Sequence, residues 1–115
     1  MPPEIADLIH LKVLDLDNND LIGLPPEIVR LTELQELDLS RNNLATVPSE
    51  VFQLTGLRGL YLNDNGLTYL PPEIGHLARL TALSLDNNLL MSLPPEISHL
   101  THLTRLSYEN NPLRS

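Results

Sequence analysis

Residues 11–33, with the sequence LKVLDLDNNDLIGLPPEIVRLTE, decide the fold because the rest of the chain repeats their pattern. The string PPEI, or its variant PSEV, recurs every 23 residues, beginning at Pro2, Pro25, Pro48, Pro71 and Pro94. Apolar residues keep one spacing through every copy, and in residues 11–33 they are Leu11, Leu14, Leu16, Leu21, Leu24, Ile28 and Leu31. Self-similarity at a fixed period of this length indicates an array of stacked supersecondary units.

The repeat divides the 115-residue chain into partial and full copies with the boundaries 1–10, 11–33, 34–56, 57–79, 80–102 and 103–115. Leucine fills 28 positions, whereas Phe, Trp and Tyr together fill four, so aliphatic side chains must form the core. A single copy cannot bury its own leucines, but stacked copies can, with roughly 1.5–3 kcal/mol for each buried side chain before chain entropy is subtracted. We therefore expect a single domain that is stabilised by stacking.

Each copy contains the pattern of one short strand followed by one helical turn. Leu14 and Leu16 flank Asp15, so in an extended chain the two leucines face one side and the aspartate faces the other. The proline pair that begins at Pro25 lacks backbone donors and holds φ near a helical value, which suits the first turn of a short helix or 3₁₀ segment. The strands are predicted to form a parallel sheet that buries Leu14, Leu37, Leu60, Leu83 and Leu106.

The pattern LxxLxLxxNxL with this period resembles the leucine-rich repeat over essentially the whole chain. Within that family, the half-repeat LPPEIxxL resembles the intracellular Ras-group type, as in scribble, erbin and the Ras suppressor proteins. The resemblance implies the α/β class and a leucine-rich-repeat solenoid, a horseshoe arc with short parallel β-strands on the concave face and helical or 3₁₀ turns on the convex face. It also implies a cytoplasmic scaffold in signal transduction, with a small GTPase or a signalling regulator as its partner.

One asparagine occupies the same place in each copy, just after the predicted strand: Asn19, Asn42, Asn65, Asn88 and Asn111. Five amides in a column could form a ligand ladder. Asparagine also turns the chain, and its side chain can satisfy backbone groups whose burial without a partner costs ~1–3 kcal/mol. We therefore expect a structural role for this column.

Composition argues against several classes of function. The net charge of −8 repels the phosphate backbone that dominates nucleic-acid affinity. No apolar run approaches the ~18 residues of a membrane span, and residues 1–20 contain no targeting signal. The chain has no cysteine, which fits a reducing compartment. We expect no nucleic-acid partner and no membrane partner.

The residues that catalysis would need are predicted to lie on opposite sides of the molecule. Serines fall on the concave sheet, at Ser40, Ser84 and Ser107, and histidines fall on the convex side, at His10, His76, His99 and His102. No glycine-rich phosphate loop is present. Three of the histidines could converge on a metal ion, but a solvated convex face explains them equally well. The sequence thus predicts no enzyme, no cofactor and no metal site.

The outward positions of the predicted strands and of the residues that follow them form the candidate binding surface. We assign partner binding to Asp15, Asp17, Glu36, Asp38, Arg41, Tyr61, Asn63, Asp64, Ser84, Asp86 and Arg105. The surface is acidic in its first half, so it should steer a basic partner surface toward itself. Because Asp15 and Asp38 are predicted neighbours, their repulsion should be relieved by a partner's Arg or Lys, with calcium as the alternative.

Aromatic side chains suggest two further features of the surface. Tyr61 has the small neighbours Gly59 and Ala82, so its ring is expected to stand out of a shallow depression as an anchor, with a tyrosine packed on the sheet as the alternative. Val29 and Phe52 occupy equivalent positions on the helical side and form a second candidate patch.

Two functions from different classes fit these observations. The first is a protein–protein interaction module that binds its partner through the acidic concave face, and the alternative is a structural spacer in a larger enzyme or assembly. The ends of the stack are expected to expose apolar side chains and to support a weak end-to-end homodimer, which sedimentation would detect. The residues expected at the two ends are Ile5, Leu8, Leu11 and Leu16, and Leu103, Leu106, Tyr108 and Leu113.

Overall fold

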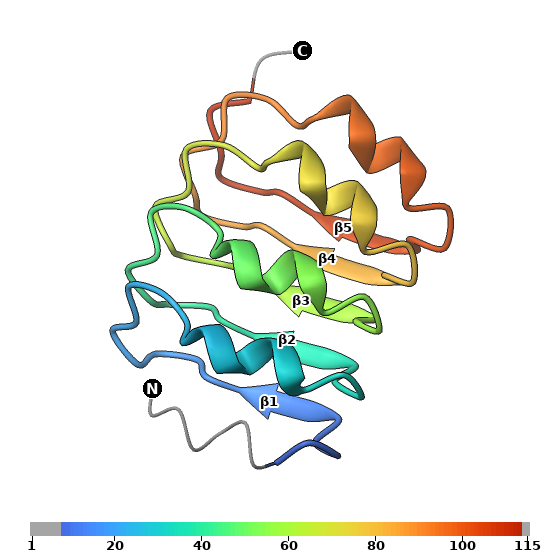
Figure 1. Ribbon diagram of the computed structural model, residues 1–115. Helices are drawn as coiled ribbons and strands as arrows, with labels where there is room; N and C mark the ends of the chain where they lie inside the picture. The colour runs from blue at the N-terminus through green and yellow to red at the C-terminus, as the bar shows by residue number, and fades with distance from the viewer. Residues whose placement is uncertain (1–7, 114–115) are drawn as a thin grey trace.

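Five short strands lie side by side in one parallel sheet, in the order β1-β2-β3-β4-β5. The computed structural model describes residues 8–113, and Figure 1 shows the repeats stacked in chain order. The strands are β1 (Val13–Asp15), β2 (Glu36–Asp38), β3 (Gly59–Tyr61), β4 (Ala82–Ser84) and β5 (Arg105–Ser107). Equivalent positions of neighbouring copies pair, as Leu14 with Leu37 and Leu37 with Leu60. The predicted parallel sheet is confirmed.

Four 3₁₀ helices of five residues lie on the other side of the repeats from the strands (Figure 1). They are η2 (Pro26–Arg30), η3 (Ser49–Gln53), η4 (Pro72–His76) and η5 (Pro95–His99). Proline stands in the first turn of three of them, and each ends at a leucine whose ψ of 62–72° leaves the helical range. The predicted helical turn after each strand is therefore confirmed. Across residues 8–113 no helix has the length and apolar character that crossing a bilayer requires.

The core lies between the sheet and the 3₁₀ helices. Leu37, Leu60 and Leu83 are at most 1% exposed, and Leu14 is buried at 9%. Leu106 is 36% exposed, so the prediction that it is buried is wrong. Both β1 and β5 have a neighbouring strand on one side only, but β1 is followed by η2 (Pro26–Arg30), whereas no 3₁₀ helix follows β5 within residues 8–113, which leaves the inward side chain of β5 with fewer packing partners.

The apolar side chains at the two ends of the described chain are exposed to different degrees. Leu8, Leu106 and Tyr108 are exposed, at 50%, 36% and 44%, in agreement with the expectation for the two ends. Partial burial is found for Leu11, Leu16, Leu103 and Leu113. Ile5 lies outside the described residues. These four leucines at the ends of the stack are thus less exposed than the sequence predicted.

The helical side has no Val29–Phe52 patch, which corrects the second candidate surface. Phe52 is buried, at 7% exposure, and Val29 is half-buried against the core. Phe52 belongs to η3, which packs between η2 and η4, so its ring joins the aliphatic core instead of facing solvent.

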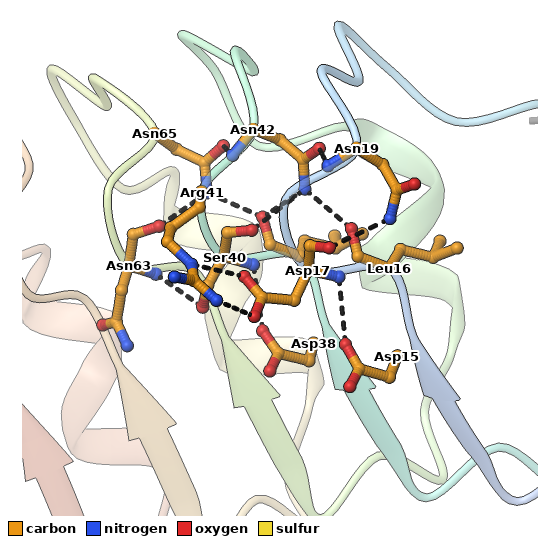
Figure 2. A network of polar contacts seen from close by, with 11 residues as sticks. Asp15, Leu16, Asp17, Asn19, Asp38, Ser40, Arg41, Asn42, Asn63 and Asn65 are labelled. Atoms are coloured by element: carbon orange, nitrogen blue, oxygen red, sulfur yellow. Dashed lines mark hydrogen bonds and ion pairs between the residues drawn. The ribbon is translucent and has the colours of Figure 1, made fainter.

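The asparagine column ties each repeat to the one before it. Asn42 Oδ1 accepts hydrogen bonds from the backbone N–H groups of Asn19 and Leu21, both at 2.9 Å. Its Nδ2 donates to the carbonyl oxygens of Leu16 and Leu39. Figure 2 shows these asparagines in a row. Asn65 and Asn88 repeat the arrangement, and all three are at most 5% exposed. The predicted structural role is confirmed.

The residue before each asparagine of the column has a positive φ, which swings the chain away from the sheet. The five residues are Asn18, Arg41, Asp64, Asn87 and Asn110, with φ between 54° and 61°. Asparagine and aspartate tolerate this left-handed conformation, whereas for arginine it costs about 1–2 kcal/mol. Arg41 is the exception in the series, and its position brings its side chain into the surface described next.

Candidate functional site

The outward residues of the strands form one row across the concave face. The last residues of the five strands stand in register as Asp15, Asp38, Tyr61, Ser84 and Ser107. Glu36 and Arg105 begin β2 and β5, and the remaining candidate residues lie two or three positions after the end of a strand. The spacing of the repeat thus places the predicted candidates on the sheet and at its C-terminal edge, where the strands end.

Asp15, Asp17 and Asp38 form an acidic cluster at this edge (Figure 2), with carboxylate oxygens within 4.8 Å of one another. Asp15 Oδ1 accepts a bond from the Asp17 backbone N–H at 3.0 Å, and Asp38 Oδ1 accepts one from the Ser40 backbone N–H at 2.9 Å. These bonds turn two carboxylates toward the backbone, so the cluster is partly stabilised by its own chain.

Arg41 supplies a cation to the acidic cluster. Its Nε donates to Asp17 Oδ1 at 2.9 Å, and its second nitrogen contacts the other carboxylate oxygen. The hydrogen bonds from Arg41 lower the pKa of Asp17, and those to Asp17 raise the pKa of Arg41. We expected a cation of the partner to relieve the repulsion among these carboxylates. At Asp17, Arg41 of the chain itself provides that cation. Within residues 8–113, Asp15 and Asp38 have no ion-pair partner.

The acidic cluster is the one place in residues 8–113 where three potential metal-ligating side chains gather. Four of its six carboxylate oxygens already accept hydrogen bonds from the chain, which leaves far fewer than the six to eight oxygens that calcium takes. The histidines do not converge, because His76 and His99 line one hollow between η4 and η5 while His102 lines a different one. That hollow also includes Arg58 and Thr81, which directly precede strands, so His102, between η5 and β5, lies near the edge where the strands begin.

A second ladder of hydrogen bonds crosses the later strands. Asn63 Oδ1 accepts bonds from Ser84 Oγ at 2.7 Å and from the Asp86 backbone N–H at 2.8 Å. Asp86 Oδ1 accepts equivalent bonds from Ser107 Oγ and Glu109 N–H. This ladder was not predicted from the sequence. Its signal in the sequence is a serine 21 residues after an asparagine or aspartate, as in Ser84 after Asn63 and Ser107 after Asp86. These predicted binding residues therefore also join neighbouring repeats.

Tyr61 lies along its own strand instead of standing out from it. A Cβ added at Gly59 would lie 2.9 Å from Tyr61 Oη and 3.2 Å from its Cε2, which places the ring over the glycine. The side chain is half-buried. The expected protruding ring is wrong because the missing side chain at residue 59 leaves room for the ring to fold down.

Tyr61 separates two shallow hollows of the concave face. One, of about 180 Å³, adjoins Ala82, Ser84 and Arg105. The other, of about 150 Å³, lies toward the acidic end and is lined by Val13, Asp15, Glu36, Asp38 and Tyr61 itself. The expected depression thus exists on both sides of the ring, and a partner side chain could contact Tyr61 from either one.

Comparison with known proteins agrees with this architecture. The family described as Leucine rich repeat matches residues 9–67 and 32–90. A leucine-rich-repeat protein of Leptospira interrogans superposes with a TM-score of 0.91 at 44% identity, over 99% of this chain and 29% of that chain. No curated protein matches the sequence.

Two further similar structures come from complexes. A chain of the Toll–Spatzle complex of Drosophila has 30% identity and a TM-score of 0.86, over 100% of this chain and 17% of that one. The second is the ectodomain of the membrane receptor kinase GASSHO1 from Arabidopsis thaliana, in complex with CASPARIAN STRIP INTEGRITY FACTOR 2. It has 35% identity and a TM-score of 0.84, over 98% of this chain and 14% of that one.

The present chain spans less than a third of the length of each of these three solved chains. The family match nevertheless covers more than half of the present chain, and the register, the asparagine column and the superpositions agree with it. The chain belongs to the leucine-rich repeat family, whose solenoids generally bind other proteins.

Proposed function

We propose that the chain is a protein–protein interaction module that binds its partner through the concave face. The observation that carries the proposal is the pair of hollows on either side of Tyr61, next to an acidic cluster only partly neutralised from within. Tyrosine and arginine are enriched among the residues that dominate binding energy at interfaces. Arg105, which lines the hollow of about 180 Å³, has no ion-pair partner within residues 8–113.

The chemistry of the acidic end favours a basic protein surface as partner. In the part of the chain that the structure describes, Asp15 and Asp38 form no ion pair, and Glu36 lines the same hollow. The net charge of −8 adds long-range attraction for a basic surface and repulsion for nucleic acid. We therefore expect association to slow as salt concentration rises.

The finer assignment rests on the sequence. The string LPPEI, present three times, supports the intracellular Ras-group type, and the absence of cysteine fits a cytoplasmic location. On this basis the partner is a small GTPase or a signalling regulator. Purified small GTPases, loaded in turn with GDP and with a non-hydrolysable GTP analogue, provide the direct test of this partner class.

The second candidate function is that of a structural spacer. It is favoured by the length of the similar solved chains, of which this chain spans 14–29%. A spacer would present its concave face to solvent and stack against other parts of a larger protein. The expected weak end-to-end homodimer would use the same apolar ends and also stays a prediction.

The test compares partner capture by the wild type, by Tyr61→Ala and by the double variant Asp15→Asn/Asp38→Asn. If the concave face binds, we expect each variant to weaken binding at least tenfold, which is about 1.4 kcal/mol. Tyr69→Ala and Asp20→Asn are matched controls, since both residues are exposed and lie outside the concave hollows.

Equal capture by all five proteins would contradict the proposed site. Capture of no partner by the wild type at any salt concentration would instead favour the spacer.

A further inference from the structure

A hollow of about 270 Å³ lies at the N-terminal edge of the sheet, where the strands begin. It is lined by Arg58, Arg79, Thr81 and His102, and we call it the basic hollow. Arg58 directly precedes β3 and Thr81 directly precedes β4. Arg58 and Arg79 also line an adjoining hollow of about 230 Å³, so the two arginines are shared by both hollows.

The repeat explains why these four side chains meet. Arg58 and Thr81 occupy equivalent positions in neighbouring repeats, as do Arg79 and His102. Thr81 donates to the Arg58 carbonyl oxygen from its backbone N–H at 2.8 Å and from its Oγ1 at 3.1 Å. Because neighbouring strands lie about 4.8 Å apart, the two pairs surround one small space.

The charges of the basic hollow are not balanced by any ion pair among residues 8–113. Acidic residues outnumber basic ones by 15 to 7 in the chain. Even so, among residues 8–113 no carboxylate lies within 4.0 Å of Arg58 or Arg79. Glu33, which lines the adjoining hollow, bonds to His10 instead. Arg58 and Arg79 thus line one space, and neither has an ion-pair partner in the described part of the chain, so an anion placed there would be attracted by two cations.

We propose that the basic hollow binds a carboxylate of an acidic segment of the protein partner. A guanidinium offers two parallel N–H donors that match the two oxygens of a carboxylate, and an imidazole offers an N–H donor in either protonation state. The Thr81 hydroxyl proton is already committed to the Arg58 carbonyl, so the two arginines and His102 supply the recognition. The proposal rests on the proposed function, because the acidic segment belongs to the partner of the concave face.

The position of the hollow favours a peptide over a free small anion. The strands lead from the basic hollow at their start to acidic residues at their end, such as Asp64 after β3. Five residues of extended chain span roughly 17 Å. A partner segment that lies along a strand, with an acidic residue at one end and a basic residue at the other, would therefore find opposite charges at both ends. The same polarity would reject the reversed orientation.

The experiment follows backbone amide NMR signals of the full chain during titration with three separate probes. They are an acetylated and amidated Gly-Glu-Asp-Glu-Gly peptide, its neutral Gly-Gln-Asn-Gln-Gly counterpart, and inorganic phosphate. The acidic peptide is expected to cause saturable shifts around Arg58, Arg79, Thr81 and His102 with millimolar affinity, which weakens with added salt. The neutral peptide is expected to cause none.

Variants test whether the arginines are responsible. Arg58→Gln and Arg79→Gln are each expected to weaken binding of the acidic peptide at least fivefold. Arg30→Gln is the matched control, since Arg30 is an exposed arginine in η2, on the other side of the repeats from the strands, and should leave affinity unchanged. All three arginines are exposed and lie outside the core, and amide spectra of each variant report whether it is folded.

Three outcomes would overturn the proposal: no saturable shifts with the acidic peptide, equal weakening by Arg30→Gln, or saturable phosphate binding without peptide binding. The last would mark a small-anion site. Because the titration uses no partner, its failure leaves the concave-face test standing. Conversely, loss of capture in Tyr61→Ala says nothing about shifts around Arg58.

Discussion

At the scale of single residues, the asparagines contribute more to this protein than their polarity suggests. Asn65 is 4% exposed, yet its side-chain amide satisfies backbone groups in its own repeat and in the repeat before it. Its Oδ1 accepts from the N–H groups of Asn42 and Leu44, and its Nδ2 donates to the carbonyls of Leu39 and Leu62. These backbone N–H and carbonyl groups are buried and have no water to bond to. An apolar side chain at residue 65 would therefore leave them without hydrogen-bond partners.

Asn65→Ala is therefore expected to lower the free energy of unfolding by ~3–5 kcal/mol, since several buried backbone groups lose their partner at once. Asn19→Ala is the matched control. Asn19 is exposed and its side chain donates only to the Asp17 carbonyl, so its loss should cost less than about 1 kcal/mol. Urea unfolding measures both. Equal costs would show that the ladder is not what stabilises the stack.

At the scale of elements, β3 differs from the other strands because it begins with glycine. Gly59 leaves the space that the Tyr61 ring fills, and Glu36 Oε1 of β2 borders the same space. A strand of three residues thereby sets the shape of the concave face, since the ring separates the two hollows.

Gly59→Ala is expected to push the Tyr61 ring off its strand, because the new Cβ would lie 2.9 Å from Tyr61 Oη. The ring is the mobile end of its side chain, so the free energy of unfolding should change by less than about 1 kcal/mol. NMR measures the result as altered Tyr61 ring signals and loss of its contact with residue 59. Gly23→Ala, at a site with nothing within 4 Å, should leave the ring signals as they are. Unaltered ring signals in Gly59→Ala would contradict the geometry.

At the scale of the whole molecule, stability comes from stacking, and its strength differs between the middle and the ends. Leu60 is fully buried between strands on both sides, whereas Leu106 has the same place in its repeat and is 36% exposed. The two leucines therefore form a natural pair for measuring what a neighbouring repeat contributes.

Leu60→Ala is expected to cost ~2–5 kcal/mol of unfolding free energy, because it opens a cavity that rigid neighbours on both sides cannot fill. Leu106→Ala should cost less than half as much, since its surroundings already admit water. Thermal and urea unfolding of both variants provide the comparison. A cost below about 1 kcal/mol for Leu60→Ala would count against stacking as the source of stability.

The repeat pattern was sufficient to predict the parallel sheet, its register and the helical turn after each strand. These features depend on local chain geometry and on a constant period, both of which can be seen in a sequence. For the same reason the pattern placed the candidate residues on the concave face, and the asparagine column could be assigned to the backbone.

Side-chain positions between repeats were decided only by the tertiary structure. Arg41 turns to Asp17, 24 residues away, and Tyr61 folds over Gly59. Phe52 enters the core, and Arg58 meets Arg79 at one hollow. Each depends on which rotamer fits beside a neighbour in the next repeat, and that neighbour differs from copy to copy. A periodic sequence therefore determines the backbone position of each side chain, whereas packing between unlike copies determines its rotamer and its contacts.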